Sequence, residues 1–206
     1  MNSLKKKYID QFGSNNITFI DTPIRDNLFL AIINLQKRTP IKLLITCGLS
    51  EYKQPIPENF HGNQHIELYF CLPSYWDLNE IENPSMNWVW TWIKKIAIHL
   101  IDKKTWYGIG HTIPCAKPNE SLSPTMKQRY FFLTNPDFVK TELEPMIIEK
   151  NEKVHFLAIM PIFEDEFDFK MGKGTLKLQK KFKDRTITEL LDDYRMTSLK
   201  TKWRII

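Results

Sequence analysis

The stretch Trp106-Tyr-Gly-Ile-Gly-His-Thr-Ile-Pro114 brings two aromatic rings, two glycines, a histidine and a proline together within nine residues. Glycine reaches backbone conformations that other residues avoid, so this composition is typical of a tight crossing between structural elements. We expect the stretch to connect a long helix before it to a second set of strands after it. Trp106 and Ile113 are expected to fill core positions, and His111 is therefore the candidate functional side chain of this stretch.

The chain before this stretch alternates between helical and extended patterns. Leu4, Tyr8 and Phe12 recur every four residues and predict a helix over 3–12. Apolar runs at 28–34 and 41–47 predict a hairpin, and strict alternation over 66–72 predicts a strand with one buried face. Residues 86–101 have apolar side chains on most of their circumference, which predicts a helix packed across a sheet.

The chain after the stretch begins with strands and ends with helices. Residues 129–133 predict a strand, and 146–150 with 153–160 predict a hairpin around Asn151-Glu152, ended by Pro161. Helices are expected over 163–171 and 175–182, and the capping-box pattern of Thr186 and Glu189 predicts a last one over 187–193. This order favours an α+β fold, a mixed and largely antiparallel sheet packed against helices, in a single domain over 1–206.

The charge is unevenly distributed along the chain. From Lys170 onward there are 11 Lys and Arg against 4 Asp and Glu, a net charge of +7, whereas residues 1–169 carry a net charge of −2. The basic C-terminal region, from Lys170 to Arg204, raises the possibility of nucleic-acid binding, with a solvated helical face as the simpler interpretation.

The compartment follows from the cysteines and the apolar runs. The cysteines, Cys47, Cys71 and Cys115, are odd in number and lack a CxxC pair, so we expect buried free thiols in a reducing compartment. The N-terminus lacks an apolar signal core, and Lys94 and Lys95 interrupt the longest apolar run. A cytoplasmic protein without a membrane span is therefore expected.

The sequence contains no motif that specifies a reaction. His61 and His65 lie four apart but do not share a helical face, and the acidic cluster 164–168 lacks the glycine and oxygen spacing of a calcium loop, so no metal or cofactor is expected. His111 could act as a general base with a carboxylate of 164–168, as in a hydrolase or transferase. The simpler alternative is that His111 holds its own loop in place.

Five stretches in register resemble the Suppressor of fused family. They are Leu44-Ile-Thr-Cys-Gly-Leu-Ser50, Ile66-Glu-Leu-Tyr-Phe-Cys-Leu-Pro73 followed by Trp76, the helix from Trp88, Thr105-Trp-Tyr-Gly-Ile-Gly-His-Thr-Ile-Pro114, and Phe156-Leu-Ala-Ile-Met-Pro-Ile-Phe-Glu-Asp-Glu-Phe167. The resemblance covers about residues 20–195 and leaves the tail 196–206 unassigned.

The resemblance implies a non-enzymatic protein-binding domain. The animal member clamps a peptide between two lobes, partly by strand addition. This chain is similar to the single-domain bacterial form, whose members are proposed to be immunity proteins that neutralise toxins. On this basis we expect a protein partner, such as a toxin occluded sterically, and a contact face that carries Trp106, His111, Glu164 and Glu166. The oligomeric state stays open.

Overall fold

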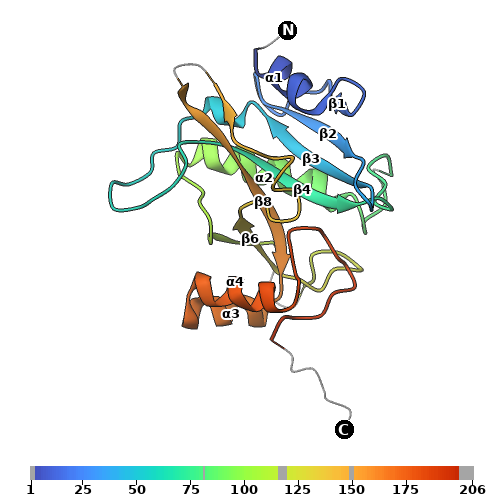
Figure 1. Ribbon diagram of the computed structural model, residues 1–206. Coiled ribbons are helices and arrows are strands. Elements are labelled where there is room, and N and C mark those ends of the chain that lie inside the picture. The colour runs from blue at the N-terminus through green and yellow to red at the C-terminus, as the bar shows by residue number, and fades with distance from the viewer. Residues whose placement is uncertain (1–2, 81, 116–119, 149–150, 200–206) are drawn as a thin grey trace.

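The fold is a strongly twisted mixed sheet with helices on both faces (Figure 1). The computed structural model describes residues 3–80, 82–115, 120–148 and 151–199. Its strands are β1 (Ile17–Phe19), β2 (Phe29–Leu35), β3 (Ile41–Cys47), β4 (His65–Pro73), β5 (Thr112–Pro114), β6 (Tyr130–Thr134), β7 (Met146–Ile147) and β8 (Lys153–Ile162). They are arranged in the order β1-β2-β3-β4-β8-β6-β5, and β7 also pairs with β8. The α+β class is confirmed.

The two central strands, β4 and β8, form the parallel pair of an otherwise antiparallel sheet among the described strands. Leu68 of β4 lies opposite Leu157 of β8 in this register. The alternating pattern of 66–72 predicted one buried face, but every residue of that segment is buried. The prediction failed because β4 is central: its two sets of alternating side chains enter two different cores.

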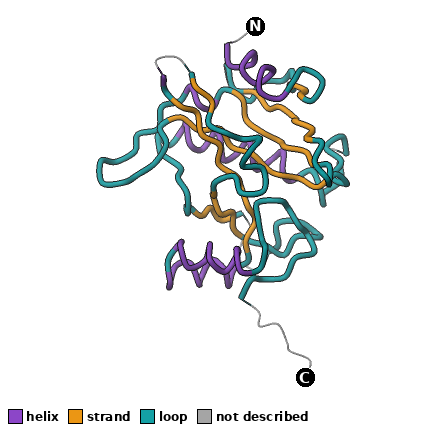
Figure 2. Tube along the Cα trace, in the orientation of Figure 1, coloured by secondary structure: helices purple, strands orange, loops and turns teal. Residues whose placement is uncertain are grey.

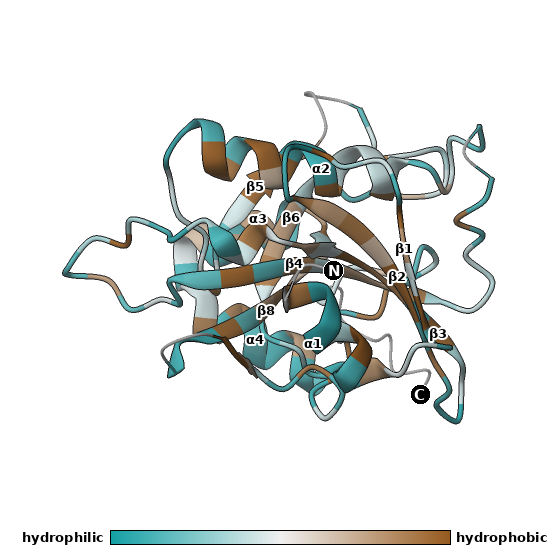
Figure 3. Ribbon diagram, turned by 90° about the horizontal axis from the view of Figure 1, so that it is seen from above, coloured by the Kyte–Doolittle hydropathy of each residue, from teal (hydrophilic) through white to brown (hydrophobic). Residues whose placement is uncertain are grey.

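The first core lies between the sheet and α2 (Trp88–Asp102). Figure 3 shows α2 along one side of the sheet, whose strands are largely apolar. Trp88 stacks on Phe131 of β6 at 6.1 Å between ring centroids and meets Phe70 of β4 edge-on at 5.3 Å. Removing a buried ring of this size costs about 3–5 kcal/mol, so these contacts fix α2 on the sheet.

The second core lies under α1 (Ser3–Phe12), on the opposite face of the sheet. Leu4, Tyr8 and Phe12 are buried, as their spacing predicted, and the Tyr8 hydroxyl donates to the Thr46 carbonyl at 2.9 Å. Near Thr46, a short 3-10 helix, η1 (Leu49–Glu51), follows β3.

Two further helices, α3 (Glu164–Lys173) and α4 (Thr175–Asp184), cover the far end of β6 and β8. Leu178 and Phe182 of α4 pack there against Phe132, Met160 and Ile162. Both helices agree with the sequence predictions. Pro161 does not end β8, which continues to Ile162. This is tolerated because β4 pairs with β8 only as far as Ala158, so the proline lies beyond that ladder.

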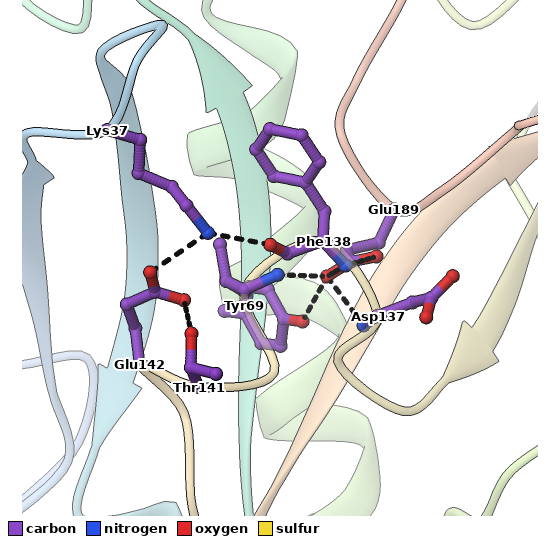
Figure 4. A network of polar contacts seen from close by, with 8 residues as sticks. Lys37, Tyr69, Asp137, Phe138, Thr141, Glu142 and Glu189 are labelled. Carbon is purple, nitrogen blue, oxygen red and sulfur yellow. Dashed lines mark hydrogen bonds and ion pairs between the residues drawn. The ribbon is translucent and has the colours of Figure 1, made fainter.

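The predicted last helix over 187–193 is absent. The structure has loop in this region (Figure 2). Glu189 turns inward instead of capping, and its carboxylate accepts hydrogen bonds from the backbone N–H groups of Asp137, Phe138 and Val139 at 2.9–3.2 Å (Figure 4). Its Oε1 also accepts from the Tyr69 hydroxyl at 3.3 Å. The carboxylate that the local pattern assigned to a helix start therefore binds the distant loop 137–139 instead. The end of the predicted strand 146–150 falls on residues 149–150, outside the described part.

Candidate functional site

The segment 105–112 leaves α2 and is fixed from both sides. Gln54, which is buried, accepts from the Tyr107 N–H at 2.6 Å and donates to the Tyr107 carbonyl at 3.2 Å. On the other side, the Gly110 N–H donates to Leu133 of β6 at 2.7 Å, and the Leu133 N–H donates back to His111 at 2.9 Å. Because these backbone N–H and C=O groups are hydrogen-bonded on both sides, the loop has little conformational freedom and holds its side chains in fixed positions.

Gly110 shows why this loop needs glycine. Its φ of +88° lies in the left-handed region, and a Cβ at this position would lie 2.7 Å from the Thr175 side chain. Thr175 is the first residue of α4. The predicted tight crossing is therefore a close approach between the loop and the corner where α3 passes into α4.

Aromatic side chains gather on the outer side of the loop. The centroids of the Trp106 and His111 rings lie 4.3 Å apart in an edge-on arrangement, and the Phe60 and Trp106 centroids lie 5.4 Å apart. Phe60 is 58% exposed although it is a large apolar residue. Gly108 lies against Trp106, where a Cβ would be 2.7 Å from the indole ring. Trp106 is half-buried, so it contributes to the outer surface as well as to packing.

The apolar surface continues onto the α3–α4 corner. Ile109, Met171 and Leu176 are 44%, 63% and 81% exposed. The corner is held against the loop by the Gly110–Thr175 approach and by Lys170, whose Nζ donates to Thr112 Oγ1 at 3.4 Å. In Figure 1 the loop around Phe60, the segment 105–111 and this corner lie on the same side of the molecule. We name the surface made by Phe60, Trp106, Ile109, His111, Met171 and Leu176 the exposed apolar strip.

His111 is a neutral side chain at neutral pH. Burial lowers its pKa, the positive charge of Lys170 lowers it further, and a hydrogen bond with the Trp106 backbone acts weakly in the opposite direction. The charged neighbour of His111 is thus a lysine. Of the carboxylates of 164–168, Glu164 is bound by Arg129 and Glu166 by Arg195, so neither of these two forms the predicted pair with His111.

The two glutamates of the expected contact face lie away from the strip. Glu164 begins α3, and its carboxylate meets Arg129 at 2.6 Å just before β6. Lys170, whose side chain reaches Thr112 of β5 beside the strip, lies about 9 Å further along α3 at 1.5 Å per residue. The four residues therefore do not form one surface: Trp106 and His111 belong to the strip, whereas Glu164 belongs to the opposite end of α3.

Glu166 is fully buried and cannot touch a partner from this position. Both its oxygens are held by the Arg195 guanidinium, at 2.9 and 2.8 Å, and it accepts from the Phe163 and Ser198 backbone N–H groups. Burial raises the pKa of Glu166, but Arg195 and these hydrogen bonds outweigh it and lower the pKa overall. Sequence reasoning missed this because Arg195 lies 29 residues away.

The remaining expectations concern metals, thiols and cations. Cys47, Cys71 and Cys115 are free and buried, as predicted. In the described ranges, no group of three or more His, Cys, Asp or Glu could hold a metal ion. No helix in the described part of the chain has the length and apolar character to cross a membrane. Lys177, Lys180, Lys181 and Lys183 are exposed on α4, and the basic region continues beyond Leu199, outside the described residues.

Gln54 and Phe60 are among the site residues that the sequence did not indicate, together with Ile109, Met171 and Leu176 of the strip. Gln54 and Phe60 both lie in the loop between η1 and β4, which contains Pro55 and Pro57 and has no apolar periodicity. A single glutamine carries no periodicity that could mark it as buried. The exposed Phe60 could have been noticed as an apolar residue within a polar loop, but its partner Trp106 is distant in sequence.

The chain is similar to known proteins in sequence pattern and in fold. The family model described as "Suppressor of fused protein (SUFU)" matches residues 26–196. No curated protein sequence matches the chain at a significant level. A solved structure described as a SUFU homologue from Neisseria gonorrhoeae has a TM-score of 0.64 and 15% identity, over 97% of this chain and 96% of that one.

Two further structures share the fold. A chain in "the Sufu-Fu complex crystal structure" has a TM-score of 0.66 and 18% identity, over 95% of this chain and 91% of that one. Drosophila Suppressor of Fused has a TM-score of 0.63 and 16% identity over 94% of this chain, which spans 50% of its length. The family model matches most of the length of this chain, and the chain therefore belongs to the Suppressor of fused family.

Proposed function

We propose that this protein is a single-domain protein-binding module whose exposed apolar strip is the contact surface for a protein partner. One observation carries this proposal. Phe60, Ile109, Met171 and Leu176 are large apolar side chains that are 44–81% exposed, and the segments that carry them lie on one side of the molecule (Figure 1). Apolar groups gathered on a surface tend to mark interaction sites, and aromatic residues are enriched among the residues that dominate binding.

The support beneath the strip favours binding. Gln54 and Leu133 fix the backbone of the loop, and Gly110 seats it on Thr175. A surface that is ordered before contact loses little conformational entropy when a partner binds. His111 is neutral and lies edge-on to Trp106, so it can enter an apolar contact without the cost of burying a charge. The family's presence in a Sufu-Fu complex agrees with a protein partner.

The more specific part of the proposal is that the chain is a cytoplasmic immunity protein of a bacterium that neutralises a toxin. The mechanism is steric: the partner's active site is covered when it binds the strip. Steric occlusion predicts that toxin bound to this protein loses substrate binding as well as turnover. A toxin that keeps its substrate affinity in the complex would contradict it.

The experiment identifies the partner and then removes the strip. The tagged protein is used to isolate its partner from the native host, and the affinity is measured by calorimetry with purified components. Phe60→Ala/Leu176→Ala should weaken binding at least tenfold, because it removes two apolar contacts of the strip. The variant should still fold, since both side chains are exposed and their loss leaves the core intact. Ile147→Ala, an equally exposed apolar residue on β7, is the matched control. Unchanged affinity of the double variant would refute the strip as the contact surface.

A further inference from the structure

A second surface lies at the N-terminal end of α3. It is a groove of about 780 Å³ between the first turns of α3, the segment 125–129 before β6 and the segment 193–197. We propose that this groove binds an arginine side chain presented by a protein partner. The inference rests on the proposed protein-binding function and adds a second, chemically distinct contact to it.

The charges of the groove favour a cation. Asp165 and Asp168 line it from α3, and Asp193 faces them from the C-terminal segment. Three cations line the groove as well, but Arg129 pairs with Glu164 and Arg195 with the buried Glu166, which leaves Lys127. Three aspartates against this one lysine make the groove negative, and an incoming cation meets a complementary surface.

Gln128 indicates more than a general attraction. It lines the same groove, its side chain is 1% exposed, and no donor among the described residues reaches its Oε1 atom. A buried acceptor without a donor costs about 1–3 kcal/mol. Because the Oε1 atom is itself buried, a ligand reaches it only by shifting the side chains over it, and a ligand that does so with an N–H group would remove this cost. The acceptor therefore favours a hydrogen-bond donor.

The groove already holds one guanidinium. Arg195 donates to both oxygens of Glu166 and to the Pro161 carbonyl, and it lies over the Phe163 ring at 4.8 Å. Carboxylate, carbonyl and aromatic face are thus combined around an arginine within the groove. Tyr194 and Met196, at 82% and 64% exposed, supply further apolar surface at the rim. Both cations can lie over an aromatic ring, but a planar guanidinium stacks on it with more contact and presents N–H groups in a fixed fork, so arginine is the better fit.

The test uses a defined probe and needs no natural partner. The ¹⁵N-labelled protein is titrated with acetyl-tetra-arginine amide, and chemical shifts are followed by NMR. The expected result is a saturable shift of the Gln128 side-chain amide together with residues 165–168 and 193–196. Asp165→Asn/Asp168→Asn should weaken the affinity at least tenfold. Asp21→Asn/Glu58→Gln, which removes two exposed carboxylates outside the groove, should leave it unchanged.

Three results would overturn the proposal. The first is a Gln128 amide that does not move, and the second is a set of shifts spread over acidic residues elsewhere. The third is equal affinity for acetyl-tetra-lysine amide, which would show charge attraction without guanidinium recognition. Phe60→Ala/Leu176→Ala should bind the peptide normally, since the strip lies at the other end of α3. Failure of the peptide titration, with partner binding still sensitive to the strip, would remove this inference alone.

Discussion

Gln54 and Tyr107 are joined by two hydrogen bonds that tie the loop after η1 to the loop after α2. The Tyr107 N–H donates to Gln54 Oε1 at 2.6 Å, and Gln54 Nε2 donates to the Tyr107 carbonyl at 3.2 Å and to the Asn63 carbonyl at 2.7 Å. The amide group of the glutamine side chain therefore forms the pair of hydrogen bonds that a neighbouring strand would form, between two segments that are not paired as strands. It positions Phe60 and Trp106 on the same surface.

Gln54→Leu should destabilise the protein by about 1–3 kcal/mol. Leucine fills a similar volume but leaves the buried Tyr107 N–H without an acceptor, which costs that amount for one buried donor. Urea unfolding monitored by tryptophan fluorescence measures the change. Glu58→Leu, at an exposed position of the same loop, should change the stability by less than about 0.5 kcal/mol. A Gln54 variant as stable as the control would show that the two bonds do not hold the loops together.

Gly110→Ala should cost about 1–3 kcal/mol, because the residue has φ of +88° and the added methyl group meets Thr175. Thr175→Ala in the same chain should recover part of this loss, since it removes the clash but not the backbone strain. Gly172→Ala is the matched control: a Cβ there meets nothing within 4 Å, and alanine favours a helix by up to about 1 kcal/mol. The melting temperatures of the wild type, the two single variants and the double variant measure these changes. A Gly110→Ala protein with the melting temperature of the wild type would contradict the close approach of Gly110 to Thr175.

Arg195→Met should be among the most destabilising single changes, at about 3–5 kcal/mol. It leaves the carboxylate of Glu166 fully buried without its cation. Glu166→Gln/Arg195→Met should regain much of the loss because no charge remains buried. A double-mutant cycle in urea measures the coupling. Equal stabilities for the single and double variants would mean that the pair contributes no specific interaction.

Glu166 also predicts a loss of stability in acid. Its pKa is lowered in the folded protein, so its contribution is present above about pH 4.5 and is lost as the pH falls towards the folded value. The difference in unfolding free energy between the wild type and Glu166→Gln should therefore shrink as the pH falls below 4.5. A difference that stays constant from pH 6 to pH 3 would be inconsistent with a carboxylate held by Arg195.

Glu67 predicts the opposite pH dependence. Burial raises its pKa to about 7, although the Thr46 and Ser50 hydroxyls and the backbone N–H groups of η1 donate to it and limit the rise. The folded protein binds this proton more tightly than the unfolded chain, so its stabilising effect is complete below pH 4.5 and is lost as the pH rises through 7. The wild type should lose about 3 kcal/mol relative to Glu67→Gln over that interval. Parallel pH profiles for the two proteins would show that Glu67 is ionised throughout.

The sequence predicted the elements whose apolar pattern continues over several turns or strand residues. The helices α1, α2, α3 and α4 and the strands of the β2–β3 hairpin lie where periodicity placed them. These patterns are local, because a helix or strand must bury one side whatever lies against it. The pattern of β4 was misjudged in burial alone, since alternation does not reveal whether the second face is also covered.

The acidic residues show the limit of local patterns. Glu189 had the spacing of a helix start but binds a remote loop instead, and Glu166 caps the start of α3 through the Phe163 N–H while it also binds the distant Arg195. A carboxylate at a helix start and one that binds a remote loop have the same local sequence, because the donors that decide between them come from another part of the chain.

The family and the strands and helices with a sustained apolar pattern were thus determined by the sequence, whereas the short strands β1 and β5 and the loop at 187–193 were not. The tertiary structure alone decided that Trp106 and His111 lie on one surface with Phe60 and the α3–α4 corner, and that Glu164 lies at the far end of α3. The physical reason is that a surface is assembled from segments whose relative positions depend on the packing of the whole sheet. No periodicity within one segment carries that information.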